Sequence, residues 1–132
     1  MNFIKADGVP IAITIFGILM GVGGTIIGIG ALIDPTSAIE FVEGADKLGT
    51  SWAGRNLGLG FAMLVAVALR HSAAYAAAFA GAIWREFSDV VAGTLDGGSF
   101  NVPFALVLVV ELVCLAICVR ATVAQRQTAT AG

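Results

Sequence analysis

The chain has 132 residues, of which 58% are hydrophobic and only 12% are charged, and its mean hydropathy is +0.96. Soluble domains usually carry about 25% charged residues, so this composition excludes an ordinary water-soluble globule and favours a membrane protein. The net charge is −2 and the basic residues are scattered, which excludes a nucleic-acid-binding surface. Two cysteines and one histidine are too few for a zinc or iron–sulfur site, so we expect no metal and no cofactor.

Four apolar stretches are long enough to cross a bilayer as helices, which takes about 20 residues. They cover residues 9–33, 52–69, 72–95 and 102–124, and a polar tail that we expect to fray follows at 125–132. None of them alternates apolar and polar residues as a strand would. The sequence therefore predicts an all-α fold, in which residues 1–132 form a single integral membrane domain built as a four-helix transmembrane bundle.

The connection at residues 34–51 is the longest one and has a pattern of its own. Ser37-Ala38-Ile39-Glu40 has the spacing of a capping box, and the apolar residues around it suit a membrane surface. We expect a short interfacial helix in this first loop, and an ordinary polar loop with one helical turn is an equal alternative.

Basic residues near the ends of the predicted helices indicate the orientation of the chain. Lys5, the Arg70-His71 turn, Arg120 and Arg126 fall on one side, whereas most acidic loop residues fall on the other. Cytoplasmic loops carry an excess of lysine and arginine. The sequence therefore predicts a multi-pass protein with both termini in the cytoplasm.

Glycines recur at helical spacing in the first two predicted helices. The stripe in the first helix consists of Gly17, Gly21, Gly24 and Gly28, and the second helix has Gly54 and Gly58. Small residues at this spacing let another helix backbone approach closely, within the chain or in a homo-oligomer. A phosphate-binding loop is excluded because no strand precedes the glycines. Cys114 and Cys118 share one helix face without a nearby charge, so we expect small packing residues there.

Charged and polar side chains inside the predicted spans are the most informative feature, since each ionised group costs about 2.5–3.5 kcal/mol near the bilayer centre. They are Arg55 and Asn56 on the second helix, Arg85, Glu86 and Asp89 on the third, and Glu111 on the fourth. At about 100° per residue, the three on the third helix share one arc, with Tyr75 on the same arc nearer the cytoplasmic end. A rise of about 1.5 Å per residue places all six in the outer half of the bundle. We therefore expect them to gather in one site.

Two arginines against three carboxylates leave one acid without a cation. Burial without a cation favours the neutral form of a carboxyl group, and a neutral acid beside an ionised one suits acid–base chemistry or proton coupling. The alternative is that these groups only tie the helices together. Glu111 could instead face a partner subunit.

The segment Trp52-Ala53-Gly54-Arg55-Asn56-Leu57-Gly58-Leu59-Gly60 resembles the small four-helix membrane proteins of the DoxX-like superfamily, which are largely uncharacterised. Asp34-Pro35 in the first loop and Asp89 in the third helix are similar to that family's pattern. The resemblance implies the four-helix layout and supports Arg55, Asn56 and Asp89 as site members. The Arg85-Glu86 pair and Glu111 depart from the pattern, so their role depends on the charge argument alone.

We therefore expect a membrane-embedded enzyme that acts by acid–base chemistry on a lipophilic small molecule. Isomerisation, cyclisation or epoxide opening would suit these residues, since none needs a cofactor. The expected catalytic residues are Asp89, Glu86, Arg55 and Arg85, and the expected substrate-binding residues are Asn56, Tyr75, Glu111 and Trp52. The alternatives are a proton-coupled small transporter and a non-catalytic binding or assembly subunit of a membrane complex. The expected partners are the lipophilic molecule, membrane lipid and a second copy of the chain.

Overall fold

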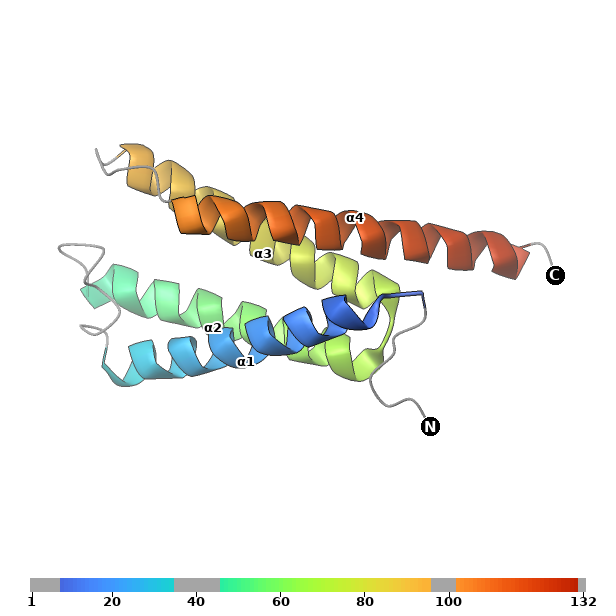
Figure 1. Cartoon of the computed structure of the whole chain (residues 1–132). Helices are drawn as coiled ribbons and strands as arrows, with labels where there is room; N and C mark the ends of the chain where they lie inside the picture. The colour runs from blue at the N-terminus through green and yellow to red at the C-terminus, as the bar shows by residue number, and fades with distance from the viewer. Residues whose placement is uncertain (1–7, 35–45, 96–101, 131–132) are drawn as a thin grey trace.

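The computed structural model describes residues 8–34, 46–95 and 102–130, and these residues form four α-helices (Figure 1). The helices are α1 (Ile11–Ile33), α2 (Asp46–Leu69), α3 (Ser72–Leu95) and α4 (Val102–Thr130). The described part of the chain contains no strand, which confirms the predicted all-α bundle.

Three helices are long and apolar enough to cross a membrane, over Ile11–Ile33, Trp52–Leu69 and Ala105–Thr130. Large apolar side chains such as Leu19, Ile26 and Leu106 are exposed on the outside of the bundle. An apolar exterior of this kind suits lipid as its solvent. The chain is therefore a membrane protein, as its composition predicts.

The helices pack as two hairpins, α1 with α2 and α3 with α4, and α2 also contacts α3. Figure 1 shows the hairpins close together where α1 and α3 begin and further apart where they end. We call the first the converging end and the second the diverging end.

A two-residue turn joins the hairpins at the converging end. Arg70 adopts a left-handed backbone conformation with φ of 54°, which ends α2, and its N–H donates to the carbonyl of Ala66. His71 then caps α3, because its Nδ1 accepts from the backbone N–H of Ala73 at 3.2 Å. A cap of this kind satisfies a donor that the first helical turn leaves unpaired.

The start of α2 differs from the prediction. α2 begins at Asp46 rather than near residue 52, so residues 46–51 belong to this helix. The predicted interfacial helix otherwise falls on residues 35–45, which lie outside the described residues.

The prediction that residues 125–132 fray is wrong for residues 125–130, because α4 continues to Thr130. Ser72 at the start of α3 donates to Gln125 Oε1 at 3.0 Å and accepts from Thr122 at 2.9 Å. These bonds attach the polar end of α4 to α3, and the Thr130 hydroxyl bonds a carbonyl within its own last turn.

The glycine stripe on α1 packs against α2 as predicted. A Cβ atom on Gly28 would lie 2.6 Å from the backbone nitrogen of Leu57, and one on Gly24 would lie 3.3 Å from the carbonyl oxygen of Asn56. Such distances leave no room for a side chain, so the two backbones approach as closely as glycine permits.

On α2, a different glycine makes the close contact within the chain, and packing of Gly54 and Gly58 in a homo-oligomer stays a prediction. A Cβ atom on Gly54 or Gly58 would meet nothing within 4 Å, whereas one on Gly60 would lie 2.6 Å from the backbone nitrogen of Thr25. Gly58 is two residues from Gly60, or about 200° around the helix, and so lies on the opposite face.

The converging end contains the hydrophobic core. Its largest buried side chains are Tyr75 and Phe79, whose rings stack at 6.5 Å, and Phe16 stacks on Phe79 at 6.1 Å. Cys114 and Cys118 are buried in the same cluster as free thiols. This core holds the two hairpins together at one end and leaves the polar residues toward the other.

Candidate functional site

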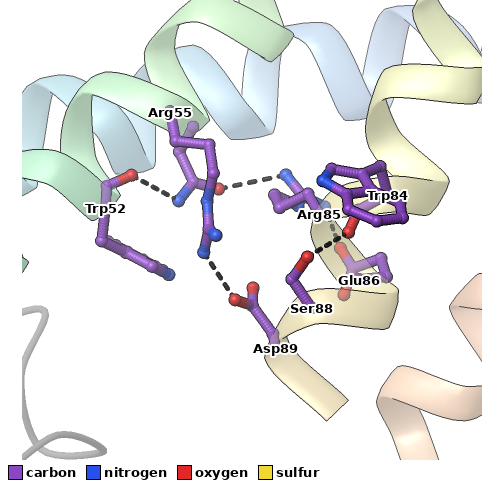
Figure 2. A network of polar contacts seen from close by, with 8 residues as sticks. Trp52, Arg55, Trp84, Arg85, Glu86, Ser88 and Asp89 are labelled. Carbon is purple, nitrogen blue, oxygen red and sulfur yellow. Dashed lines mark hydrogen bonds and ion pairs between the residues drawn. The ribbon is translucent and has the colours of Figure 1, made fainter. Parts of the chain in front are cut away.

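The candidate site lies toward the diverging end, where α2 faces α3 (Figure 2). Its residues come from the first part of α2, the last part of α3 and the first part of α4. Because α1 and α2 pack through glycine, α2 is held in place while its other side presents polar groups to α3.

Arg55 and Asp89 form an ion pair between α2 and α3. Arg55 Nη2 lies 2.5 Å from Asp89 Oδ1, and the two side chains are 38% and 29% exposed. Figure 2 shows Arg55 reaching from α2 toward Asp89. The pair is therefore half-buried and accessible from the edge of the bundle.

A second set of contacts connects Trp52, Asn56, Arg85 and Glu86. Asn56 Nδ2 donates to the backbone carbonyl of Trp52 at 2.9 Å, and Asn56 Oδ1 accepts from Arg85 Nη1 at 3.0 Å. Arg85 Nη2 also forms an ion pair with Glu86 Oε1. This continuous network engages both terminal nitrogens of the Arg85 guanidinium and one carboxyl oxygen of Glu86.

Three carboxyl oxygens in the interior have no hydrogen-bond partner among the described residues. They are Glu86 Oε2 and both side-chain oxygens of Glu111. Glu86 is 3% exposed and Glu111 is 0% exposed, and Glu111 interacts electrostatically with Glu86 and Arg85. Buried polar groups nearly always have partners, so each exception needs an explanation such as a water, a ligand or a proton.

The structure brings together most of the residues that the sequence singles out. Arg55 meets Asp89, Arg85 meets both Asn56 and Glu86, and Glu111 lies on α4 within range of the second pair. The Trp52 backbone carbonyl takes part directly.

Tyr75 is not part of this cluster. It is 0% exposed, packs on Phe79 and contributes to the hydrophobic core at the converging end. It precedes Glu86 by eleven residues on α3, or about 16 Å along the helix axis. Its position on the same arc as the charged residues therefore does not bring it to the site.

Sequence reasoning did not single out Thr14. Its hydroxyl is buried near the core and, like the Tyr75 hydroxyl, has no hydrogen-bond partner among the described residues. The available signal was a hydroxyl at an otherwise apolar position of α1. The two hydroxyls lie at the converging end, apart from the carboxylates.

No group of three or more His, Cys, Asp or Glu side chains that could hold a metal ion occurs in the part of the chain that the structure describes. Asp89 and Glu86 instead pair with arginines, which repel a cation. The chemistry open to this arrangement is proton transfer and the binding of an electron-rich oxygen.

Comparison with protein-family models, with curated proteins and with solved structures finds no match to this chain. The resemblance to the DoxX-like superfamily stays a prediction. Function must therefore be argued from the site itself.

Proposed function

We propose that the protein is a membrane-embedded enzyme that acts by acid–base chemistry on a lipophilic small molecule. The observation that supports this most strongly is the environment of Glu86. One of its carboxyl oxygens pairs with Arg85, while the other is buried without a partner among the described residues. A general acid or base needs one oxygen that is free to exchange a proton with the reacting group.

The membrane placement of α3 is part of this proposal. Its 24 residues match the length of α2 and span about 36 Å, against about 30 Å for the hydrocarbon core. Its charged residues Arg85, Glu86 and Asp89 all have an ion-pair partner, which lowers the penalty for placing them at depth. Four crossings, with Arg70, Arg120 and Arg126 at the converging end, put both termini in the cytoplasm.

The arginines suit the binding of a carbonyl, epoxide or developing oxyanion. The Arg55–Asp89 pair is the more exposed of the two, so a substrate oxygen that reaches it from the lipid can compete with Asp89 for the guanidinium. Both acids form an ion pair with an arginine, but Glu86 also has a buried oxygen without a hydrogen-bond partner among the described residues, which makes Glu86 the better candidate for the proton-transferring group. Asn56 holds Arg85 in position through its amide oxygen.

Mass spectrometry of small molecules extracted from the purified protein tests this proposal. We expect a lipophilic, oxygen-containing compound at a level near one per chain in the wild type and its loss in Arg55→Ala. Arg120→Ala is the matched control, because Arg120 is exposed on α4 away from the cluster. Equal amounts of bulk lipid alone in all three preparations would contradict the proposal.

A proton-coupled transporter is the second candidate, favoured by the fully buried carboxyl group of Glu111, which has no hydrogen-bond partner in the part of the chain that the structure describes. Such a protein would move protons across liposome membranes when a lipophilic cation or acid is supplied. The enzyme proposal expects no coupled flux. Substrate-driven acidification that disappears in Glu111→Gln would favour transport instead.

An assembly role is favoured by one other observation, the open face of α2 around Gly54 and Gly58. No described residue lies within 4 Å of a Cβ atom at either position, so a second helix backbone can approach there. A pull-down in mild detergent distinguishes the cases. A homo-oligomer agrees with an enzyme, whereas one stoichiometric foreign partner indicates an assembly subunit.

A further inference from the structure

We propose that Glu86 and Glu111 form a carboxyl pair between α3 and α4 that holds one exchangeable proton, with Glu111 as the protonated member. The inference deepens the proposed function, since this pair would supply the proton that Glu86 transfers. The role of the pair in catalysis rests on the proposed function. The existence of the pair does not, because it is argued from burial and charge.

The burial of Glu111 provides the first argument. Its side chain is 0% exposed, and neither carboxyl oxygen has a hydrogen-bond partner among the described residues. An ionised carboxylate in such a position is strongly disfavoured, because no partner among the described residues compensates for its lost hydration. A proton removes the charge and also gives the group an O–H that can donate.

The charges on the neighbouring helices provide the second argument. On α3, Arg85 already pairs with Glu86, and on α2, Arg55 already pairs with Asp89. The titratable neighbour on α4 is Cys114, three residues further on, and α1 has no charged residue between Ile11 and Ile33. The nearest arginine along α4, Arg120, is nine residues or about 13 Å away.

The free oxygen of Glu86 provides the third argument. Glu86 Oε2 is buried without a hydrogen-bond partner among the described residues, as both Glu111 oxygens are. The hydrogen bond between Ser72 and Gln125 fixes the register of α3 against α4. Glu86 lies fourteen residues after Ser72 and Glu111 lies fourteen residues before Gln125, so the two glutamates lie at the same level of the antiparallel hairpin. Two carboxyl groups that share a site do not both ionise readily. The proton is assigned to Glu111 because Arg85 contacts the other oxygen of Glu86.

The proton movement balances within the pair. Glu111 passes its proton to Glu86 Oε2 and becomes the carboxylate, and Glu86 then donates that proton to a substrate atom. A proton removed from another atom of the same substrate returns along the reverse route. An isomerisation therefore needs no external acid or base.

Infrared spectroscopy of the purified protein in H2O and D2O tests the proton directly. The wild type should show the carbonyl stretching band of a protonated carboxyl group, and Glu111→Gln should remove it. Asp89→Asn is the matched control and should keep the band, because Asp89 belongs to the separate ion pair with Arg55. A wild-type spectrum without this band, or a band that persists in Glu111→Gln, would overturn the proposal.

Labelling with a lipid-soluble carbodiimide gives an independent reading on the wild-type chain, should Glu111→Gln fail to fold. The reagent takes up the carboxyl proton on nitrogen while the carboxylate oxygen adds to its central carbon, so only a protonated acid reacts. We expect one adduct per chain at Glu111 and none at Asp89, with labelling that falls as the pH rises. An adduct at Asp89 in place of Glu111 would overturn the proposal.

Two neighbouring variants separate electrostatics from damage to the fold. Glu86→Gln removes a negative charge and should lower the labelling of Glu111, whereas Arg85→Gln removes a positive charge and should raise it. A change in the same direction for both would contradict the pair. A labelled Glu111 in a protein that carries no ligand would support the proton site while refuting the enzyme proposal, so the two can fail separately.

Discussion

The contact between α1 and α2 gives the sharpest structural prediction, through the substitution of Gly60 by alanine. A Cβ atom there would lie 2.6 Å from the nitrogen of Thr25, 2.8 Å from the oxygen of Gly21 and 2.9 Å from the carbonyl carbon of Gly24. All three are backbone atoms, so no side-chain rotation relieves the overlap. Reaching an ordinary contact of 3.4 Å requires the helices to separate locally by about 0.8 Å.

Gly58→Ala is the matched control, because a Cβ atom there meets nothing within 4 Å. Both substitutions gain about 1 kcal/mol of helix propensity, which cancels when they are compared. The overlap should then make Gly60→Ala less stable than Gly58→Ala by about 1–3 kcal/mol.

The assay is unfolding of the purified protein in mixed detergent micelles by titration with sodium dodecyl sulfate, followed by circular dichroism and tryptophan fluorescence. Equal midpoints for the two variants would refute the close approach of the helices at Gly60. A lower stability for Gly58→Ala would place the interface on the opposite face of α2.

Three further predictions concern polar groups and use the same unfolding assay. Asp89→Asn should destabilise the protein by about 1–3 kcal/mol, between the values for exposed and buried ion pairs, and a double-mutant cycle with Arg55→Gln should show coupling; purely additive effects would contradict the pair. Ser72→Ala should cost about 1–2 kcal/mol through its two hydrogen bonds to α4. Ser88→Ala, which loses only a bond within its own helix, should cost less, and the reverse order would be evidence against the α3–α4 link. Tyr75→Phe should change stability by less than about 1 kcal/mol, since its buried hydroxyl lies beside the Thr14 hydroxyl without a well-formed hydrogen bond among the described residues; a larger loss would show that the two hydroxyls are firmly bonded.

The fold could be predicted to a large extent because hydrophobic length and glycine spacing are local signals. α3 has the predicted bounds, and α1 differs from them only at its start. The end of α4 was missed because its polar residues are stabilised by Ser72, a contact between residues about fifty positions apart. Composition alone favours fraying there.

The glycines show where a pattern stops being informative. Gly54 and Gly58 have the same spacing as the stripe on α1, yet they lie on the open face of α2. Spacing places residues on one face of a helix, but only the packing of the whole bundle determines which face meets a neighbour.

The candidate site could be predicted as a gathering of charges, because depth and angular position both follow from helix geometry. The pairing of these residues could not be predicted from the sequence. Arg85 pairs with its own neighbour Glu86 and at the same time reaches Asn56 on α2. Tyr75 shares the arc of these residues but differs in depth. The curvature and divergence of the hairpins, which sequence periodicity does not encode, decide such contacts.

The central claim is that the buried carboxylates perform chemistry on a bound molecule rather than only holding it. The most direct measurement incubates the compound extracted from the wild type with fresh protein in D2O and follows it by mass spectrometry. We expect the wild type to convert it or to introduce solvent deuterium, and we expect Glu86→Gln to bind it without either change. If the wild type returns the compound unconverted and unlabelled, the site binds a ligand without acid–base catalysis and the account is contradicted.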